Sequence, residues 1–344
     1  MPRVIGIDPG TLSIDLCGLD AGRLWLDRSL PTQEALADPT LLSTLLHTGG
    51  TPDLIAGPSG YGLPMIRATE TTERDLCLAF LGGEGEEGGI GGLRRVARQL
   101  AQSGLPVVYT PGVIHLPTVP KHRKLNRVDM GTADKVAAAT LGVWDQARRF
   151  ESAPTRVSFI LLELGGAFTA ALAVDRGAIV DGLGGTSGPM GWQSGGAWDG
   201  EVAFLAGTVR KEMLFRGGRE AHLEGDDRTG FDAYIEGAHK AALALTAALP
   251  HPREILLSGR HATDPAVRAA LAPRLEAIAP VRDLAGFARV AKQGAQGAAL
   301  IADGLSGGEH APLVESLRLR EARGTVLDYL RVIPAEEAYR RIGL

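Results

Sequence analysis

Two apolar runs separated by a short polar turn open the chain, in the stretch VIGIDPGTLSIDLCGL at 4–19. The first run ends at Asp8, the chain turns through Pro9, Gly10 and Thr11, and apolar residues then resume in alternation with others. This pattern predicts two β-strands joined by a tight turn. Asp, Pro and Gly are ordinary turn formers, so a hairpin alone accounts for them. The alternative is a functional turn, whose backbone N–H and hydroxyl groups approach phosphate while Asp8 holds a hydrated Mg²⁺.

The same pattern returns in RVSFILLELGGAFTAALAVDRGAIVD at 156–181. An apolar run ends at Glu163, a glycine turn follows at Gly165 and Gly166, and a second apolar run begins near Thr169. Each of the two acidic turns stands near the start of one part of the chain. Facing each other, two such hairpins would hold a polyphosphate between two lobes.

Three further segments suit that arrangement. GTADKVAAATLG at 131–142 places Thr132 or Asp134 at a helix start, ahead of an alanine-rich face suited to close packing. GAQGAALIADGL at 294–305 predicts a second helix of the same kind, and close packing alone would explain both. In EILLSGRHATDP at 254–265, an apolar strand ends at Ser258, Gly259 and Arg260, where backbone can lie flat against a purine.

Composition is typical of a globular chain of two domains. It has 344 residues, 44% of them hydrophobic and 22% charged, and its net charge of -4 gives no indication of nucleic acid or an anionic membrane as the main partner. Cys17 and Cys77 have no metal or redox spacing, and no charged-then-apolar leader precedes Val4. No apolar run reaches the roughly 18 residues of a membrane span. We therefore predict a soluble cytoplasmic protein.

Competing motifs predict less. GEGEEG at 83–88 has the spacing of a dinucleotide-binding loop, but its three glutamates would repel a pyrophosphate, and we interpret it as a surface loop. The sequence contains no Walker-type G-x-x-x-x-G-K-[ST] motif and no zinc-protease H-E-x-x-H motif. The basic run PKHRKLNR at 120–127 is either a solvated face or a means of steering an anion into the cleft.

With five segments in this order, the chain resembles the superfamily of acetate and sugar kinases, heat-shock chaperone ATPases and actin. They correspond to a first phosphate loop, a first connecting helix, a second phosphate loop, an adenosine segment and a second connecting helix: 8–11, 131–142, 163–169, 255–260 and 294–305. NRVDMGTADK and GGTSGPMGWQSGGAWDGEVAFL are, more narrowly, similar to an uncharacterised prokaryotic family labelled predicted butyrate kinase.

The resemblance implies an α/β fold of the two-lobed, ribonuclease H-like ATPase type. Each lobe should contain a mixed five-stranded sheet flanked by helices, with a nucleotide cleft between the lobes and a hinge at the two connecting helices. The first lobe should span 1–140 with the tail 306–344, and the second lobe 141–305. Substrate residues should come from the first-lobe side, in 57–67 and 111–130.

The resemblance also implies ATP and Mg²⁺ as cofactors and assigns roles to residues of the five segments. Asp8, Asp134 and Glu163 are the expected catalytic residues, and Asp8 and Glu163 the expected metal ligands. The expected nucleotide-binding residues are Gly10, Thr11, Gly165, Gly166, Thr169, Gly259 and Arg260.

The phosphoryl acceptor is left open between a carboxylate and a hydroxyl group. Acetate and butyrate kinases usually begin with Asn-Pro-Gly and a downstream lysine, whereas Asp8 stands here with no lysine after it, and Glu163 stands where many relatives carry Asp. Asp134 would be the general base for a hydroxyl acceptor, or merely an acid that favours the helix dipole. A carboxylate acceptor needs cations instead, for which the candidates are Arg67, Arg123 and Arg127.

The favoured function is an ATP-dependent kinase of a small carboxylate, similar to butyrate kinase. The alternatives are a kinase of a small hydroxyl-bearing metabolite or sugar, and an ATP-binding regulatory or assembly protein with no metabolite acceptor. The expected partner is a small-molecule substrate, with a homodimer as an option.

Overall fold

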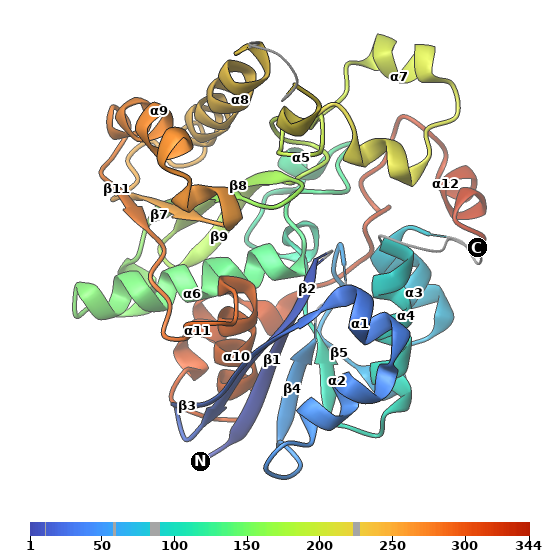
Figure 1. The fold of residues 1–344 in the computed structure, drawn as a ribbon, viewed down its shortest axis with the longest axis vertical. Helices are drawn as coiled ribbons and strands as arrows, with labels where there is room; N and C mark the ends of the chain where they lie inside the picture. The colour runs from blue at the N-terminus through green and yellow to red at the C-terminus, as the bar shows by residue number, and fades with distance from the viewer. Residues whose placement is uncertain (11, 58–59, 83–89, 223–227) are drawn as a thin grey trace.

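The computed structural model describes residues 1–10, 12–57, 60–82, 90–222 and 228–344. Two β-sheets lie at opposite ends of the molecule, with helices between and around them (Figure 1). Within the described residues, no helix is both long enough and apolar enough to cross a lipid bilayer.

The first sheet is mixed and has the strand order β3-β2-β1-β4-β6-β5. β2 pairs antiparallel with β1 and β3, β4 and β6 run parallel to β1, and β5 closes the edge antiparallel to β6. The sheet has six strands where five were predicted, because the two-residue β5 adds one at the edge. The strand bounds are β1 Arg3–Pro9, β2 Ser13–Asp20, β3 Arg23–Pro31, β4 Leu54–Gly57, β5 Ile66–Arg67 and β6 Val107–Tyr109.

The second sheet has the five strands that were predicted, in the order β11-β10-β7-β8-β9. β7, β8 and β9 form an antiparallel meander, and β10 and β11 extend it in parallel, which repeats the plan of the first sheet. Their bounds are β7 Phe159–Leu164, β8 Thr169–Asp175, β9 Ala178–Leu183, β10 Ile255–Ser258 and β11 Val281–Asp283.

Helices α6 (Ala133–Arg149) and α10 (Gln293–Leu305) lie between the sheets and pack against each other (Figure 1). Their small residues permit unusually close contact, because a Cβ on Gly297 would overlap the Ala137 carbonyl of α6; in the same way, a Cβ on Gly6 of β1 would overlap the α10 backbone at Ala299. Small side chains at such a crossing let the two backbones meet directly. The sequence predicted both helices, and α6 extends seven residues beyond the predicted end at 142.

The other helices cover the outer faces. α1 (Thr32–Ala37), α2 (Pro39–Leu46), α3 (Glu73–Phe80) and α4 (Ile90–Gln102) accompany the first sheet, and α8 (Thr229–Leu245) and α9 (Pro265–Glu276) the second (Figure 1). Shorter helices are α5 (Lys121–Lys124), α7 (Gly200–Ala206), α11 (Ala311–Ser316) and α12 (Ala335–Arg341).

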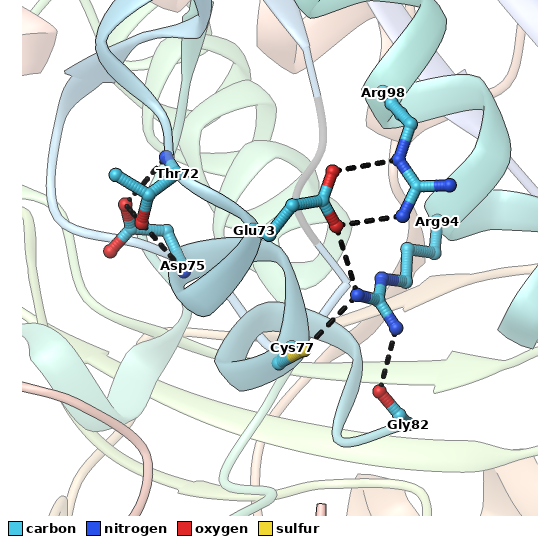
Figure 2. A network of polar contacts seen from close by, with 7 residues as sticks. All are labelled: Thr72, Glu73, Asp75, Cys77, Gly82, Arg94 and Arg98. Atoms are coloured by element: carbon cyan, nitrogen blue, oxygen red, sulfur yellow. Dashed lines mark hydrogen bonds and ion pairs between the residues drawn. The ribbon is translucent and has the colours of Figure 1, made fainter. Parts of the chain in front are cut away.

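A polar clamp ties α3 to α4 (Figure 2). Glu73 accepts two hydrogen bonds from Arg98 and one from Arg94, and Arg94 also contacts the Cys77 sulfur at 3.0 Å and the Gly82 carbonyl at 2.9 Å. Because Arg94 is buried, each of these partners offsets the cost of removing its guanidinium from water. The clamp therefore fixes the two helices relative to each other.

The strands of the first sheet come from 3–109 and those of the second from 159–283, on either side of the lobe boundary expected at 140. α10, inside the range expected for the second lobe, packs on β1 and β2 of the first sheet. In the tail expected to rejoin the first lobe, the Tyr339 ring lies 4.8 Å from the guanidinium of Arg74 in α3. The division of the chain into lobes stays a prediction.

Candidate functional site

A cavity of about 560 Å³ lies between the two sheets, where β1, β7 and β10 end. Both glycine turns, the starts of α6 and α10 and the segment after β10 contribute to its wall. Lining residues among those expected from the sequence are Asp8, Gly10, Asp134, Glu163, Gly165, Gly166, Gly259 and Arg260. Five segments far apart in the chain thus meet at one place.

The first turn is held by hydrogen bonds to residues near it in the chain. The Gly10 N–H donates to the Ser13 carbonyl at 2.8 Å, and the Thr32 hydroxyl donates to the Gly10 carbonyl at 2.7 Å. Asp8 is buried beside the first turn of α10, where a Cβ on Gly294 would lie only 2.5 Å from its carboxylate. Thr11, expected to bind nucleotide, lies outside the described residues.

The second turn faces the first. The Gly165 N–H donates to the Phe168 carbonyl at 2.9 Å, which closes the turn after β7. A Cβ on Gly166 would point toward the first turn, in ordinary contact with Leu12 at 3.6 Å. The gap between the turns is therefore bordered by backbone that follows a strand of each sheet.

Lys135 stands between two of the predicted carboxylates. Its ammonium lies 2.5 Å from Asp134 and 2.8 Å from Glu163, and Thr132 donates a further hydrogen bond to Asp134. Burial opposes the charged ammonium, but the two carboxylates outweigh it and hold the pKa of Lys135 well above its ordinary value. Lys135 was not among the residues predicted from the sequence, although its place directly after Asp134 at a helix start was a usable signal.

The three carboxylates of the site are shifted in different directions. Burial, followed by the charge of Asp134, raises the pKa of Asp8 to about 7. Burial also raises the pKa of Glu163, against the opposing effect of Lys135. For Asp134 burial acts in the same direction, but Lys135 and Thr132 outweigh it and lower the pKa. Asp134 is therefore an ionised partner of Lys135, whereas Asp8 and Glu163 gain a proton more readily than an ordinary carboxyl group.

A second lysine, Lys292, reaches the first turn from the residue before α10. Its ammonium lies 2.6 Å from the Ser13 hydroxyl and 3.1 Å from the buried Asp15 carboxylate. A Cβ on Gly10 would be 3.2 Å from the same ammonium, so the positive charge lies over the turn. No lysine follows closely after the first turn in the sequence, yet the fold supplies one from a distant segment. No local sequence pattern predicted the contacts of Lys292 with Ser13 and Asp15.

The last residue of β10 and the two residues after it line the cavity. Ser258 pairs in register with Glu163, and its buried hydroxyl has no hydrogen-bond partner among the described residues. Gly259 has φ +88° and a Cβ there would lie 2.5 Å from the Leu164 carbonyl. Its lack of a side chain thus serves the approach of β10 to the second turn. Arg260 lines the cavity beside it.

Four expected residues do not line this cavity. Thr169 is fully buried within β8. Arg67 is exposed on β5, Arg127 is exposed, and Arg123 donates to the Val180 carbonyl at 2.7 Å and lies 3.8 Å from Asp181. The cavity-lining cations among the described residues are instead Lys135, Arg260 and Lys292.

The site offers oxygen ligands that suit Mg²⁺. No cluster of three or more His, Cys, Asp or Glu side chains able to hold a metal occurs in the described parts of the chain. Mg²⁺ does not require one, because it commonly binds one or two carboxylates and completes its shell with water and substrate phosphates. Asp8 fits that role: its raised pKa reflects a buried negative charge in need of a cation.

Comparison with solved structures shows the fold. A propionate kinase from Francisella tularensis subsp. tularensis matches with a TM-score of 0.60 at 12% identity, over 86% of this chain and 99% of that one. The acetate kinase of Porphyromonas gingivalis matches at 0.55 and 14% identity, over 81% and 88% of the two chains. That of Entamoeba histolytica matches at 0.55 and 11% identity, over 80% and 86%. The chain has the two-lobed α/β fold of the actin-like ATPases, as predicted.

The chain itself belongs to the family described as "Protein of unknown function (DUF1464)", whose model matches residues 6–332. No curated protein matches the sequence. The relationship to the structures above is thus one of fold.

Proposed function

We propose that this protein is an ATP-dependent kinase of a small carboxylic acid, similar in reaction to butyrate kinase. The observation that carries the proposal is the meeting of two glycine turns around Lys135, Asp8 and Glu163 in one cavity. Phosphoryl transfer depends mainly on positioning and on neutralising charge, and this arrangement supplies both.

In the proposed complex, the triphosphate of ATP lies between the turns at Gly10 and Gly166, and the nucleoside lies toward Ser258 and Arg260. Lys292 provides positive charge over the first turn, and Asp8 holds Mg²⁺ through its water shell. The unpartnered Ser258 hydroxyl supports this placement, because a buried polar group requires a partner that a nucleotide can offer. Bound Mg²⁺ would neutralise charge on the phosphates.

The reaction joins an acceptor carboxylate oxygen to the γ-phosphorus while the bond from that phosphorus to the β–γ bridging oxygen breaks. ADP leaves with the electron pair of that bond, and the product is an acyl phosphate. A carboxylate is already ionised near neutral pH, so no proton has to be removed. Lys135, between the two lobes, supplies positive charge where the transfer occurs.

The state of Asp134 favours a carboxylate over a hydroxyl acceptor. A general base for an alcohol needs a free carboxylate with a pKa near the working pH. Asp134 instead accepts from Lys135 and Thr132, and its pKa is lowered. It is thus a weak base whose oxygens are already engaged, and we assign it to holding Lys135.

A product assay tests the proposal. The purified protein is incubated with ATP, Mg²⁺ and either small acids or small alcohols and sugars, and ADP release is followed with and without hydroxylamine. Hydroxylamine converts acyl phosphates to hydroxamates and leaves phosphate esters intact. We expect ADP release that depends on an acid, together with hydroxamate. Ester products would show a hydroxyl acceptor, and slow turnover unaffected by any compound would show a regulatory ATPase.

Asp134→Asn separates the two acceptor classes further. If the acceptor is an acid, the variant should still transfer the phosphoryl group to it, provided that Lys135 keeps its position without the Asp134 carboxylate. A loss of about 10²- to 10⁴-fold confined to an alcohol substrate would contradict the carboxylate proposal.

A further inference from the structure

One end of the cavity has an apolar wall built from both lobes. Tyr61, Ala79, Phe80 and Leu93 line it from the first lobe, and Phe168 and Phe215 from the second. None of these residues belongs to the phosphate turns or the nucleoside segment as proposed above, apart from Phe168 at the end of the second turn. This wall therefore faces the part of the cavity that is left for the acceptor.

The wall on the second-lobe side is an aromatic pair. The rings of Phe168 and Phe215 meet edge to face with centroids 4.9 Å apart. Phe215 ends the short 3₁₀ helix η4 (Lys211–Phe215), in which the Lys211 ammonium lies 3.5 Å from the Phe80 carbonyl and 5.3 Å from the Tyr61 ring. The contacts of Lys211 place η4 against the first-lobe wall, so the two halves of the wall face a common space.

The wall on the first-lobe side is held rigidly. Phe80 is the last residue of α3, and Leu93 lies in the first turns of α4. The clamp of Glu73 with Arg94 and Arg98 joins these two helices (Figure 2), and Arg94 directly follows Leu93 in the chain. A fixed apolar surface of this kind selects a ligand by its shape and by the hydrocarbon area it covers.

The polar groups at this end already have partners within the protein. Asp129 accepts from the Thr186 N–H at 2.9 Å, the Thr186 hydroxyl at 3.0 Å and the Gly131 N–H at 3.1 Å, and the Tyr61 hydroxyl lies beside them. A polyhydroxylated acceptor placed here would bury hydroxyl groups against aromatic rings without hydrogen bonds. Such mismatches are strongly rejected.

We propose that the acceptor is a monocarboxylic acid with a hydrocarbon body, whose carboxylate points to Lys135 and whose chain or ring lies among Phe80, Phe168 and Phe215. The inference rests on the proposed kinase function and adds the class of acid. Acids that carry hydroxyl or amino groups along the chain are excluded by the same wall.

Chain length provides the test. Turnover is measured with the series acetate, propionate, butyrate, pentanoate and hexanoate, with benzoate, and with lactate and gluconate as polar acids. Each added methylene should raise kcat/KM about 4-fold while the chain still gains contact with the wall. Lactate should be much poorer than propionate, which differs from it by one hydroxyl. Highest efficiency with acetate, or equal efficiency with gluconate and hexanoate, would overturn the inference.

Two phenylalanines of one segment provide a matched comparison. Phe215→Ala should reduce the increase of kcat/KM with chain length. It should lower kcat/KM for hexanoate about tenfold and have little effect on kcat/KM for acetate. Phe204→Ala removes a side chain that is 77% exposed in α7 and should leave the series unchanged. Phe215→Leu retains an apolar side chain, so it should preserve part of the slope if Phe215→Ala fails to fold. An unchanged slope in folded Phe215→Ala would count against the subsite.

Binding distinguishes failure of the subsite from failure of the kinase proposal. Calorimetric titration of hexanoate and gluconate into the protein with ADP and Mg²⁺ needs no turnover. Hexanoate binding that weakens in Phe215→Ala, without phosphorylation of any acid, would contradict the kinase and support the subsite. Phosphorylation of acids with no preference for hydrocarbon chains would support the kinase proposal and contradict the apolar subsite.

Discussion

Lys135 holds two like charges together at the centre of the cavity. Replacing it with methionine keeps the apolar stem and leaves Asp134 and Glu163 without their cation. Removing one partner from a largely buried ion pair is strongly destabilising. We therefore expect Lys135→Met to lower the free energy of unfolding by on the order of 3 kcal/mol, as measured by urea denaturation at neutral pH.

The conservative variant provides the control for that prediction. Lys135→Arg keeps the charge and should recover much of the lost stability, while its bulkier head should still impair transfer. Equal stability of the methionine variant and the wild type would show that the carboxylates do not depend on Lys135.

Asp8 should make the ligand-free protein less stable as the pH rises. Its folded pKa is raised to about 7 from 3.8, first by burial and then by Asp134, so between these values the folded state keeps a proton that the unfolded chain has lost. The stabilisation is complete below the unfolded pKa and disappears as the pH passes through the folded one. Thermal unfolding without Mg²⁺ from about pH 5 to about pH 8 should show this decline.

Asp8→Asn removes the titrating group and should reduce that decline. With Mg²⁺ and ATP present, the same variant should slow phosphoryl transfer far more than it affects folding, because the amide no longer attracts the hydrated cation. Identical pH profiles for the variant and the wild type would rule out Asp8 as the source, and an unchanged turnover number at saturating Mg²⁺ would contradict its metal role.

The acidic turns were predictable from the sequence, whereas their partners were not. Asp8 and Glu163 each end an apolar strand and precede glycine, which is a local pattern. Lys292 meets Ser13 and Asp15 only because α10 packs on β1, a contact between distant segments that no local pattern encodes. Arg67, Arg123 and Arg127 were predicted as cationic groups that would grip a carboxylate, and none of the three lines the cavity.

At the scale of the elements, the glycines of the second turn and of β10 should respond differently to substitution. A methyl group on Gly166 would meet no close neighbour and would enter the gap between the turns. Gly166→Ala should therefore weaken ATP binding with little loss of stability. Gly259→Ala should lower stability, because φ +88° is unfavourable for alanine and the new methyl would press on Leu164. Calorimetric titration with ATP and urea denaturation separate the two effects.

This pair refines the interpretation of the sequence, which assigned Gly259 and Gly166 alike to close nucleotide approach. Wild-type ATP affinity in Gly166→Ala would show that the nucleotide does not pass between the turns. Wild-type stability in Gly259→Ala would show that the ends of β7 and β10 can separate at no cost.

Elements with a strong period or turn signal were predictable, and those that depend on a distant partner were not. The two hairpins, the strand at Ile255–Ser258 and the two small-residue helices lie where the pattern places them. The two-residue β5 exists because it pairs with β6. η4 has no periodic signal of its own, yet it brings Phe215 to the cavity.

At the scale of the whole molecule, ATP and Mg²⁺ should draw the two lobes together. Contacts across the cavity already join them at Lys211 and Phe80. Spin labels on Glu70→Cys and Phe204→Cys, two exposed positions with one in each predicted lobe, should give a shorter and narrower distribution of label-to-label distances when nucleotide is added. The native Cys17 and Cys77 are buried. Labels on Phe204→Cys and Leu243→Cys, both in the second lobe, are the control, and an equal change in both pairs would contradict closure.

The crossing of α6 and α10 determines what kind of motion this can be. At Gly297 the two backbones touch without intervening side chains, so neither helix can advance along the other without collision with the next, larger residue. The two helices can therefore rotate about their contact at Gly297, but they cannot slide along each other. Displacement then grows in proportion to distance from Gly297, so Asp134, three residues before the contact point Ala137 on α6, should move less than groups farther from the crossing.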